Sequence, residues 1–110
     1  MIIKSAKIKK VAGRSVAQRD SIINHGSCLL KSSCSEMKIG NAAFDKNCKK
    51  INLHHLLQET DGLILELTEE EHHSKYDEIH RHTEISEIDR QEFNKWKSSY
   101  WKNRYSEICR

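Results

Sequence analysis

Proline is absent from this chain of 110 residues, glycine occurs four times, and aromatic residues make up only 6%. Hydrophobic residues account for 36% and charged residues for 32%. This polar composition favours one soluble, helix-rich domain with a modest core. No apolar run approaches the roughly 20 residues that span a bilayer, which excludes a transmembrane protein, so we expect no membrane partner. The N-terminus lacks the apolar segment of a signal peptide, so any export would depend on another carrier.

The net charge of +3 conceals a strong asymmetry along the chain. Residues 1–50 hold eleven Lys and Arg against three acids, a net charge of +8, whereas residues 51–110 hold eight against thirteen, a net charge of −5. A basic first half suits a phosphate backbone as partner. The lysines near the N-terminus are equally compatible with a solvated tail.

The four cysteines do not form a Cys-x-x-Cys pattern, and their spacing is too loose to predict a zinc site. We interpret them as free thiols in a reducing cytosol. The alternatives are a small structural metal site or a disulfide between the N-terminal loops. The cysteines are Cys28, Cys34, Cys48 and Cys109.

The N-terminal third shows only weak periodicity. Residues 2–11 are compatible with a short strand or an arm, residues 15–23 with a short helix, and residues 36–39 with a helical turn. We therefore expect a basic N-terminal arm with loops over residues 1–35 and a core over residues 36–110, within one domain overall.

The core is organised around residues 52–80, whose pattern is typical of strand, turn, strand and helix. Residues 51–57 form a short apolar run around two histidines, and Asp61-Gly62 is a hairpin turn signal. Residues 63–68 alternate with a period of two, which predicts a second strand. Thr68 and Glu71 match a capping box, so a helix is expected to begin near Glu69.

A second helix is predicted over residues 87–108, beginning with a capping box at Ser86. Its apolar residues recur at helical spacing and are mostly aromatic, which favours packing against the hairpin over base stacking. The stripe comprises Ile88, Phe93, Trp96, Tyr100, Trp101, Tyr105 and Ile108.

The histidines carry the candidate chemistry. His54 and His55 are neighbours on a predicted strand, so they point to opposite faces or sit at a strand end where the chain bends. Either arrangement suits one metal ligand and one base better than two ligands of one ion. His72 lies in the first turns of the predicted helix. His80 is eight positions further on, about 12 Å along a straight helix, so the helix breaks between them or His80 has another part.

Together these segments resemble the ββα-metal nucleases of the HNH/endonuclease VII superfamily, and within it the LHH nuclease domains of bacterial polymorphic toxins. The resemblance covers roughly residues 36–104, and no single triplet carries it; the order of several motifs does. A Gly-Xaa-Thr-Asn segment expected upstream is replaced here by Ser-Ser-Cys-Ser at residues 32–35. The matching segments are Ile51-Asn52-Leu53-His54-His55-Leu56-Leu57-Gln58, Glu66-Leu67-Thr68, Glu71-His72, Ile79-His80, Ile88-Asp89-Arg90, Phe93, and Tyr100-Trp101-Lys102 with Arg104.

The resemblance implies an α+β fold with a ββα-metal core, flanking helices and a long C-terminal helix. It implies that His54, His72 and His80 hold the metal and that His55 is the general base, with the roles of His54 and His55 open to exchange. Tyr76 or Asp77 could complete the site in place of His80. Glu66, counted with the catalytic residues, would orient a histidine or bind an arginine. The candidate nucleic-acid contacts are Gln58 and four cations of the last helix, most of whose stems are equally suited to cover apolar surface. These cations are Arg90, Lys97, Lys102 and Arg104.

The function implied is that of a metal-dependent endonuclease using Mg²⁺, Zn²⁺, Ni²⁺ or Mn²⁺, with DNA favoured over RNA. Such a domain would be the C-terminal toxin domain of a secreted carrier protein, act in the cytoplasm of a target cell, and have a cognate immunity protein. The alternatives are a non-catalytic, zinc-stabilised module that binds nucleic acid, and an RNase toxin. An unliganded histidine beside the metal, here His55, distinguishes a nuclease from the zinc-stabilised module, because a structural zinc site does not need one.

Overall fold

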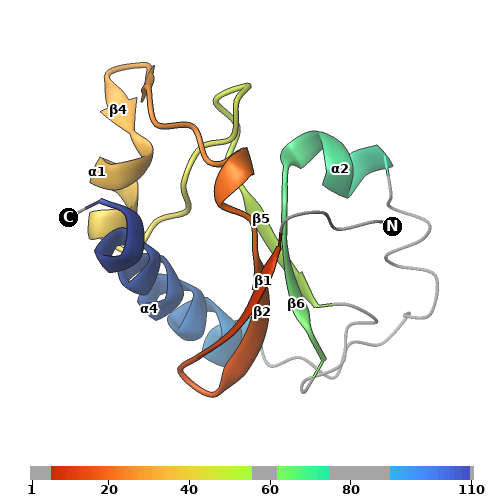
Figure 1. Ribbon diagram of the computed structural model, residues 1–110. Coiled ribbons are helices and arrows are strands. Elements are labelled where there is room, and N and C mark those ends of the chain that lie inside the picture. Colours follow the sequence, from red (N-terminus) through yellow and green to blue (C-terminus); the bar gives the residue numbers. More distant parts are fainter. Residues whose placement is uncertain (1–5, 56–61, 75–89, 110) are drawn as a thin grey trace.

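The computed structural model describes residues 6–55, 62–74 and 90–109. Its centre is a four-stranded sheet in the order β1-β2-β6-β5, with the long helix α4 (Arg90–Ile108) on one face and the short helix α2 (Glu69–Ser74) on the other side (Figure 1). The predicted α+β class with a long C-terminal helix is confirmed. No helix in the described ranges is long and apolar enough to cross a bilayer.

The N-terminal segment contributes two strands to this sheet. β1 (Lys7–Val11) and β2 (Arg14–Gln18) form an antiparallel hairpin, and β2 also pairs in parallel with β6. The helix predicted over residues 15–23 is therefore wrong. Partners on both sides of β2 decide its conformation, and a pattern read from one segment cannot show them. Only a 3₁₀ turn (Asp20–Ile22) follows.

The predicted hairpin and its helix are confirmed where the structure describes them. β5 (Asn52–His55) pairs antiparallel with β6 (Ile64–Leu67), and α2 begins directly after β6. The backbone N–H of Glu71 donates to Thr68 Oγ1 at 3.1 Å, and the backbone N–H of Thr68 donates to Glu71 Oε1 at 2.9 Å. This capping box ties the start of α2 to the end of β6. Asp61 of the predicted turn lies outside the described residues.

Helix α4 supplies the aromatic residues of the main core. The aromatic rings of the stripe stack along the helix and pack on the sheet, so the core interpretation is confirmed. The indole N–H of Trp96 donates to the carbonyl of Val11 at 2.9 Å and ties α4 to the first strand. The predicted start at residues 86–89 lies outside the described residues. The buried aromatic residues of the helix are Phe93, Trp96, Tyr100 and Trp101.

Two disulfides fasten the remaining loops, so the expectation of free thiols is wrong. Cys28 bonds to Cys48 and Cys34 bonds to Cys109, with Cα separations of 5.5 and 5.7 Å. These pairs are 20 and 75 positions apart in the chain, so only the tertiary fold brings them within bonding distance. The first joins the small hairpin of β3 (Ser27–Cys28) and β4 (Lys31–Ser32) to the loop before β5.

The second disulfide holds helix α1 (Ser33–Lys38) against the end of α4. The helical turn expected at residues 36–39 is thus a slightly longer helix that begins earlier. Gly40 follows it with φ +89°, and a Cβ there would collide with the side chain of Ser98 on α4. Glycine is therefore required where the chain leaves α1.

Candidate metal and nuclease site

His54 and His55 point to opposite faces of the sheet. On β5 they lie opposite Leu65 and Ile64 of β6, and neighbouring residues of a strand alternate between faces. His55 turns towards α4, where its ring lies 4.6 Å from the ring of Phe93 and is only 1% exposed. His54 turns the other way, towards α2. The expectation that the two histidines point to opposite faces is therefore confirmed.

His54 meets His72 on the α2 side. Their ring centroids are 5.4 Å apart, with the rings inclined by 62°. The capping box sets where α2 begins, and this places His72 beside β5. The structure thus brings together two of the histidines that the sequence singled out as metal ligands.

A divalent ion fits this pair by the chemistry of its donors. Neutral imidazole is a common ligand of transition metals. Two nitrogens that bind one zinc ion at about 2.0–2.1 Å lie roughly 3.4 Å from each other, and rings with centroids 5.4 Å apart can satisfy this. Within residues 6–55, 62–74 and 90–109, no group of three His, Cys, Asp or Glu side chains is clustered for a metal. His80, Tyr76 and Asp77, proposed as the remaining ligand, lie outside these ranges.

Glu69 is a neighbour of this pair that the sequence analysis missed. Its carboxylate accepts from the amide of Asn52 at 3.0 Å and contacts Nε2 of His73 at 2.8 Å. The hydrogen bonds from Asn52 and His73, with the nearby charges of His73 and His72, lower the pKa of Glu69 below its usual 4.5. The spacing of four between Glu69 and His73 on one helix was the available signal. An ionised carboxylate beside the imidazoles supports binding of a cation.

The surroundings of His55 keep its ring neutral. Burial, followed by the charge of Arg14, lowers its pKa from 6.5 to about 4. Nη1 of Arg14 lies 3.3 Å from Nε2 of His55. Because a guanidinium only donates, Nε2 accepts and the proton is assigned to Nδ1. Nδ1 is buried and has no hydrogen-bond partner among the described residues. His55 is therefore set apart from the pair formed by His54 and His72.

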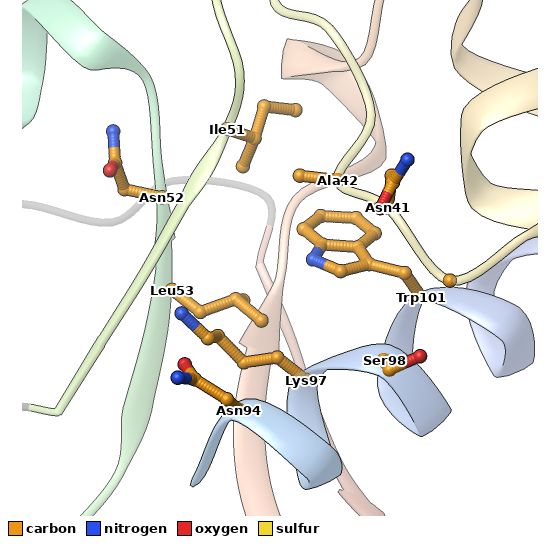
Figure 2. A pocket seen from close by; sticks show the side chains of 10 residues that line it. Asn41, Ala42, Ile51, Asn52, Leu53, Asn94, Lys97, Ser98 and Trp101 are labelled. Atoms are coloured by element: carbon orange, nitrogen blue, oxygen red, sulfur yellow. The ribbon is translucent and has the colours of Figure 1, made fainter. Parts of the chain in front are cut away.

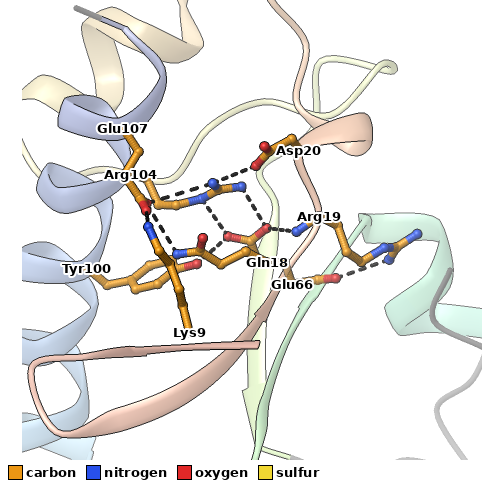
Figure 3. A network of polar contacts seen from close by, with 8 residues as sticks. All are labelled: Lys9, Gln18, Arg19, Asp20, Glu66, Tyr100, Arg104 and Glu107. Carbon is orange, nitrogen blue, oxygen red and sulfur yellow. Dashed lines mark hydrogen bonds and ion pairs between the residues drawn. The ribbon is translucent and has the colours of Figure 1, made fainter. Parts of the chain in front are cut away.

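Glu66 is the centre of a buried polar network on the α4 side (Figure 3). Its side chain is fully buried and accepts from Nε and Nη2 of Arg104 at 3.0 and 3.1 Å. It also accepts from the hydroxyl of Tyr100 and from the backbone N–H of Arg19. Of the two roles expected for Glu66, binding an arginine is confirmed. Because its oxygens are occupied in this way, the geometry does not favour a catalytic role.

The same network corrects the role expected for Arg104. Arg104 is 1% exposed, and its guanidinium also donates to Asp20 at 2.7 Å. Burial by itself lowers the pKa of Arg104, but the carboxylate of Glu66 and the other partners outweigh this and raise it. A cation that is buried and paired cannot reach a phosphate. Arg104 is therefore a structural residue and not a nucleic-acid contact.

The other predicted nucleic-acid contacts lie on accessible parts of α4. Arg90 and Lys102 are exposed, and Lys97 is half-buried above the ring of Phe93, with Nζ 5.2 Å from the ring centroid. Burial and the charge of Arg90 lower the pKa of Lys97. Gln58 lies outside the described residues.

Lys97 stands at a cleft of about 380 Å³ between α4, β5 and the loop after α1 (Figure 2). Asn94 and Lys97 reach into it from α4, Asn41 lines it from the loop, and Leu53 lines it from β5. The cleft is therefore polar on its α4 side. It lies on the face of β5 opposite the ring of His54, because Leu53 and His54 alternate.

Comparison with known families agrees with this geometry. A family model described as a nuclease of the HNH/ENDO VII superfamily with conserved LHH matches residues 33–107. The protein is thus a nuclease-superfamily domain, and it belongs to the LHH family. Leu53, His54 and His55 form its Leu-His-His triplet. No solved structure matches the chain.

Proposed function

We propose that this domain is a metal-dependent endonuclease that hydrolyses phosphodiester bonds of DNA. Membership of the LHH family supports nuclease activity, and nucleic acid is the substrate that this implies. The observation that carries the metal-dependent assignment is the approach of His54 on β5 to His72 on α2, with centroids 5.4 Å apart.

In this proposal His54 and His72 bind the ion, and Glu69 favours its charge from the start of α2. A bound divalent ion stabilises the negative charge that develops on a phosphate and makes bound water more acidic. The two elements that carry the ligands are held together by β6 and the capping box. His80 is the proposed third ligand, as the resemblance implies.

His55 remains the proposed general base. One observation favours this role and another opposes it. Its low pKa leaves it unprotonated and able to accept a proton at neutral pH. Its cover by Phe93 and its contact with Arg14 oppose direct access to an ion held by His54. The effect of His55 variants on cleavage, measured apart from metal binding, decides the role.

We further propose that the domain is a toxin delivered by a secreted carrier into the cytoplasm of a target cell, and that an immunity protein neutralises it. The two disulfides support passage through an oxidising compartment, where such bonds form and persist. The basic strand β1, which exposes Lys7, Lys9 and Lys10, supports an anionic partner.

Incubation of the purified domain with plasmid DNA and with total RNA tests this function. Both substrates are offered with Mg²⁺, Mn²⁺, Ni²⁺ or Zn²⁺ and with excess chelator. We expect DNA cleavage that needs a divalent ion and is lost in His54→Ala and His72→Ala. His25→Ala is the matched control, because His25 is exposed and lies outside the site.

The outcomes separate the alternatives. Cleavage that persists in excess chelator would rule out the metal-dependent reading. Cleavage of RNA alone would make the domain an RNase. Tight zinc binding without cleavage of either substrate would favour a zinc-stabilised binding module.

A further inference from the structure

The β3–β4 hairpin presents two leucines to solvent. Cys28 pairs with Lys31 and closes a two-residue turn of Leu29 and Leu30, which are 94% and 103% exposed. Their φ angles are +52° and +69°, in the left-handed region. Turns of this kind favour Asn-Gly, and a bulky residue is strained there. We call Leu29 and Leu30 the leucine tip. The fold holds both in a backbone conformation that is unfavourable for leucine. Residues strained in this way cluster at functional sites.

The leucine tip is fixed at its base. Cys28 is 2% exposed and is bonded to Cys48, so the hairpin is anchored to the loop before β5. The amide of Asn24 lies 3.5 Å from Sγ of Cys28 at the same point. Figure 1 shows β4 and α1 together at one end of the molecule, away from α2. The tip is therefore an anchored projection at the end of the molecule that carries α1.

The segment that carries the leucine tip is basic. Residues 21–50 contain only two acids, and both are buried: Glu36 is 7% exposed and paired with Lys50, and Asp45 is 2% exposed. Asp45 accepts backbone N–H groups of its own loop. The segment therefore shows solvent no exposed carboxylate. Its exposed lysines are Lys31, Lys38, Lys46, Lys49 and Lys50.

We propose that the leucine tip is a wedge that inserts between base steps of duplex DNA while the flanking lysines contact phosphates. This inference rests on the proposed DNase function, which supplies the substrate class. Leucine is among the apolar side chains that act as such wedges and kink a duplex. Single-strand sites use aromatic rings for stacking, and the tip has none. Leucine is also under-represented among hot spots of protein interfaces.

Lysines at the base of the leucine tip would bind the phosphate backbone. Lys31 follows the tip directly, and Lys49 follows Cys48, which is bonded to Cys28 at the base of the tip. Cations at the base of an apolar projection bind the backbone on either side of the inserted step. The wedge would therefore hold duplex DNA at a second point, separate from the histidines.

The test measures unstacking in a duplex of about 20 base pairs that carries 2-aminopurine, with chelator to stop cleavage and without reductant. We expect the fluorescence of 2-aminopurine to rise when wild-type protein binds. The double variant Leu29→Asn with Leu30→Gly removes the wedge but gives the turn its favoured residues, so its melting temperature is kept or raised. It loses the fluorescence rise and binds at least about tenfold more weakly, as expected for losing buried leucine surface. The control Ile39→Ser, at another exposed apolar residue, changes neither the fluorescence rise nor the binding affinity.

Charge variants supply the second readout. Lys31→Gln and Lys49→Gln each reduce the slope of log affinity against log salt by about 0.9, as one lost phosphate contact predicts. They leave the 2-aminopurine signal of the saturated complex in place.

Three outcomes would overturn the wedge. One is a wild-type complex without unstacking, and another is unstacking that the double variant retains. The third is binding to vesicles of phosphatidylglycerol and phosphatidylcholine that the double variant loses while DNA binding stays unchanged, which would make the tip a lipid anchor. Because binding is measured without cleavage, loss of the wedge alone leaves the nuclease proposal intact, and inactive protein that still unstacks DNA refutes only the nuclease.

Discussion

Arg104 and Glu66 face each other in the interior of the domain, 38 positions apart in the chain, with Nε of the arginine 3.0 Å from Oε2 of the carboxylate. Both side chains are almost fully shielded from solvent, at 2% and 0% exposure. The contact joins α4 to β6, the strand that leads into α2. It therefore helps to position the helix that carries His72.

Removing one partner of this pair is expected to destabilise the fold strongly. Arg104→Met leaves the buried carboxylate of Glu66 without its countercharge, and a broken buried pair typically costs about 3–5 kcal/mol. Urea denaturation measures the loss. Lys102→Met, on an exposed position of the same helix, is the control and should stay within about 0.5 kcal/mol of wild type. Similar stability of both variants would show that the pair contributes little.

Replacing both partners should cost less than the two single changes add up to. The double variant Arg104→Met with Glu66→Gln removes both charges together, so no uncompensated ion remains buried. The same urea experiment completes the cycle. Additive losses would mean that the two residues act independently.

Variants of the three histidines are expected to separate metal binding from turnover. His54→Ala and His72→Ala remove proposed ligands and should weaken metal affinity, measured by calorimetry, as well as cleavage. If His55 is the base, His55→Ala keeps metal binding while cleavage falls by about 10²–10⁴-fold. Because the ring of His55 packs against Phe93, its variant is assayed well below its melting temperature. Loss of metal binding in His55→Ala with retention in His54→Ala would reverse the assignment.

Loss of the disulfide between Cys34 and Cys109 is expected to lower stability. It closes a long loop and fastens α1 to the end of α4, and removing such a bond typically costs about 2–5 kcal/mol. Thermal unfolding of the double variant Cys34→Ala with Cys109→Ala, compared with oxidised and with reduced wild type, measures this. Equal melting temperatures of all three would show that the bond adds nothing to the fold.

Acid should weaken the anchoring of α1 through Glu36. The hydrogen bond and charge of Lys50 lower the pKa of Glu36 below its usual 4.5, although burial opposes them. A carboxyl whose pKa is lower in the folded state stabilises the fold above the unfolded pKa and loses that contribution as the pH falls through the folded value. Urea unfolding between pH 6 and about pH 3 should show a shallower decline for Glu36→Gln than for wild type. Parallel curves would contradict this.

Local patterns were sufficient for the central motif. The period of two over residues 63–68 predicted β6, the pairing of Thr68 with Glu71 predicted the start of α2, and helical spacing of aromatic residues predicted the buried face of α4. Each depends on contacts within a few positions of the chain or on a period that one element imposes by itself. The order of these motifs around the Leu-His-His triplet was also enough to indicate the nuclease family.

Contacts between distant segments were decided only by the tertiary structure. β2 is a strand because β1 and β6 flank it, and the cysteines are paired because segments 20 and 75 positions apart in the chain meet. Arg104 looked like a phosphate contact in the sequence, but the turn of α4 that carries it faces Glu66 in the core. The sequence determined the types of side chain available for chemistry. The alternation of β5 and the packing of α4 and α2 decided that His54 meets His72 while His55 is buried against Phe93, because each strand face has a different neighbour.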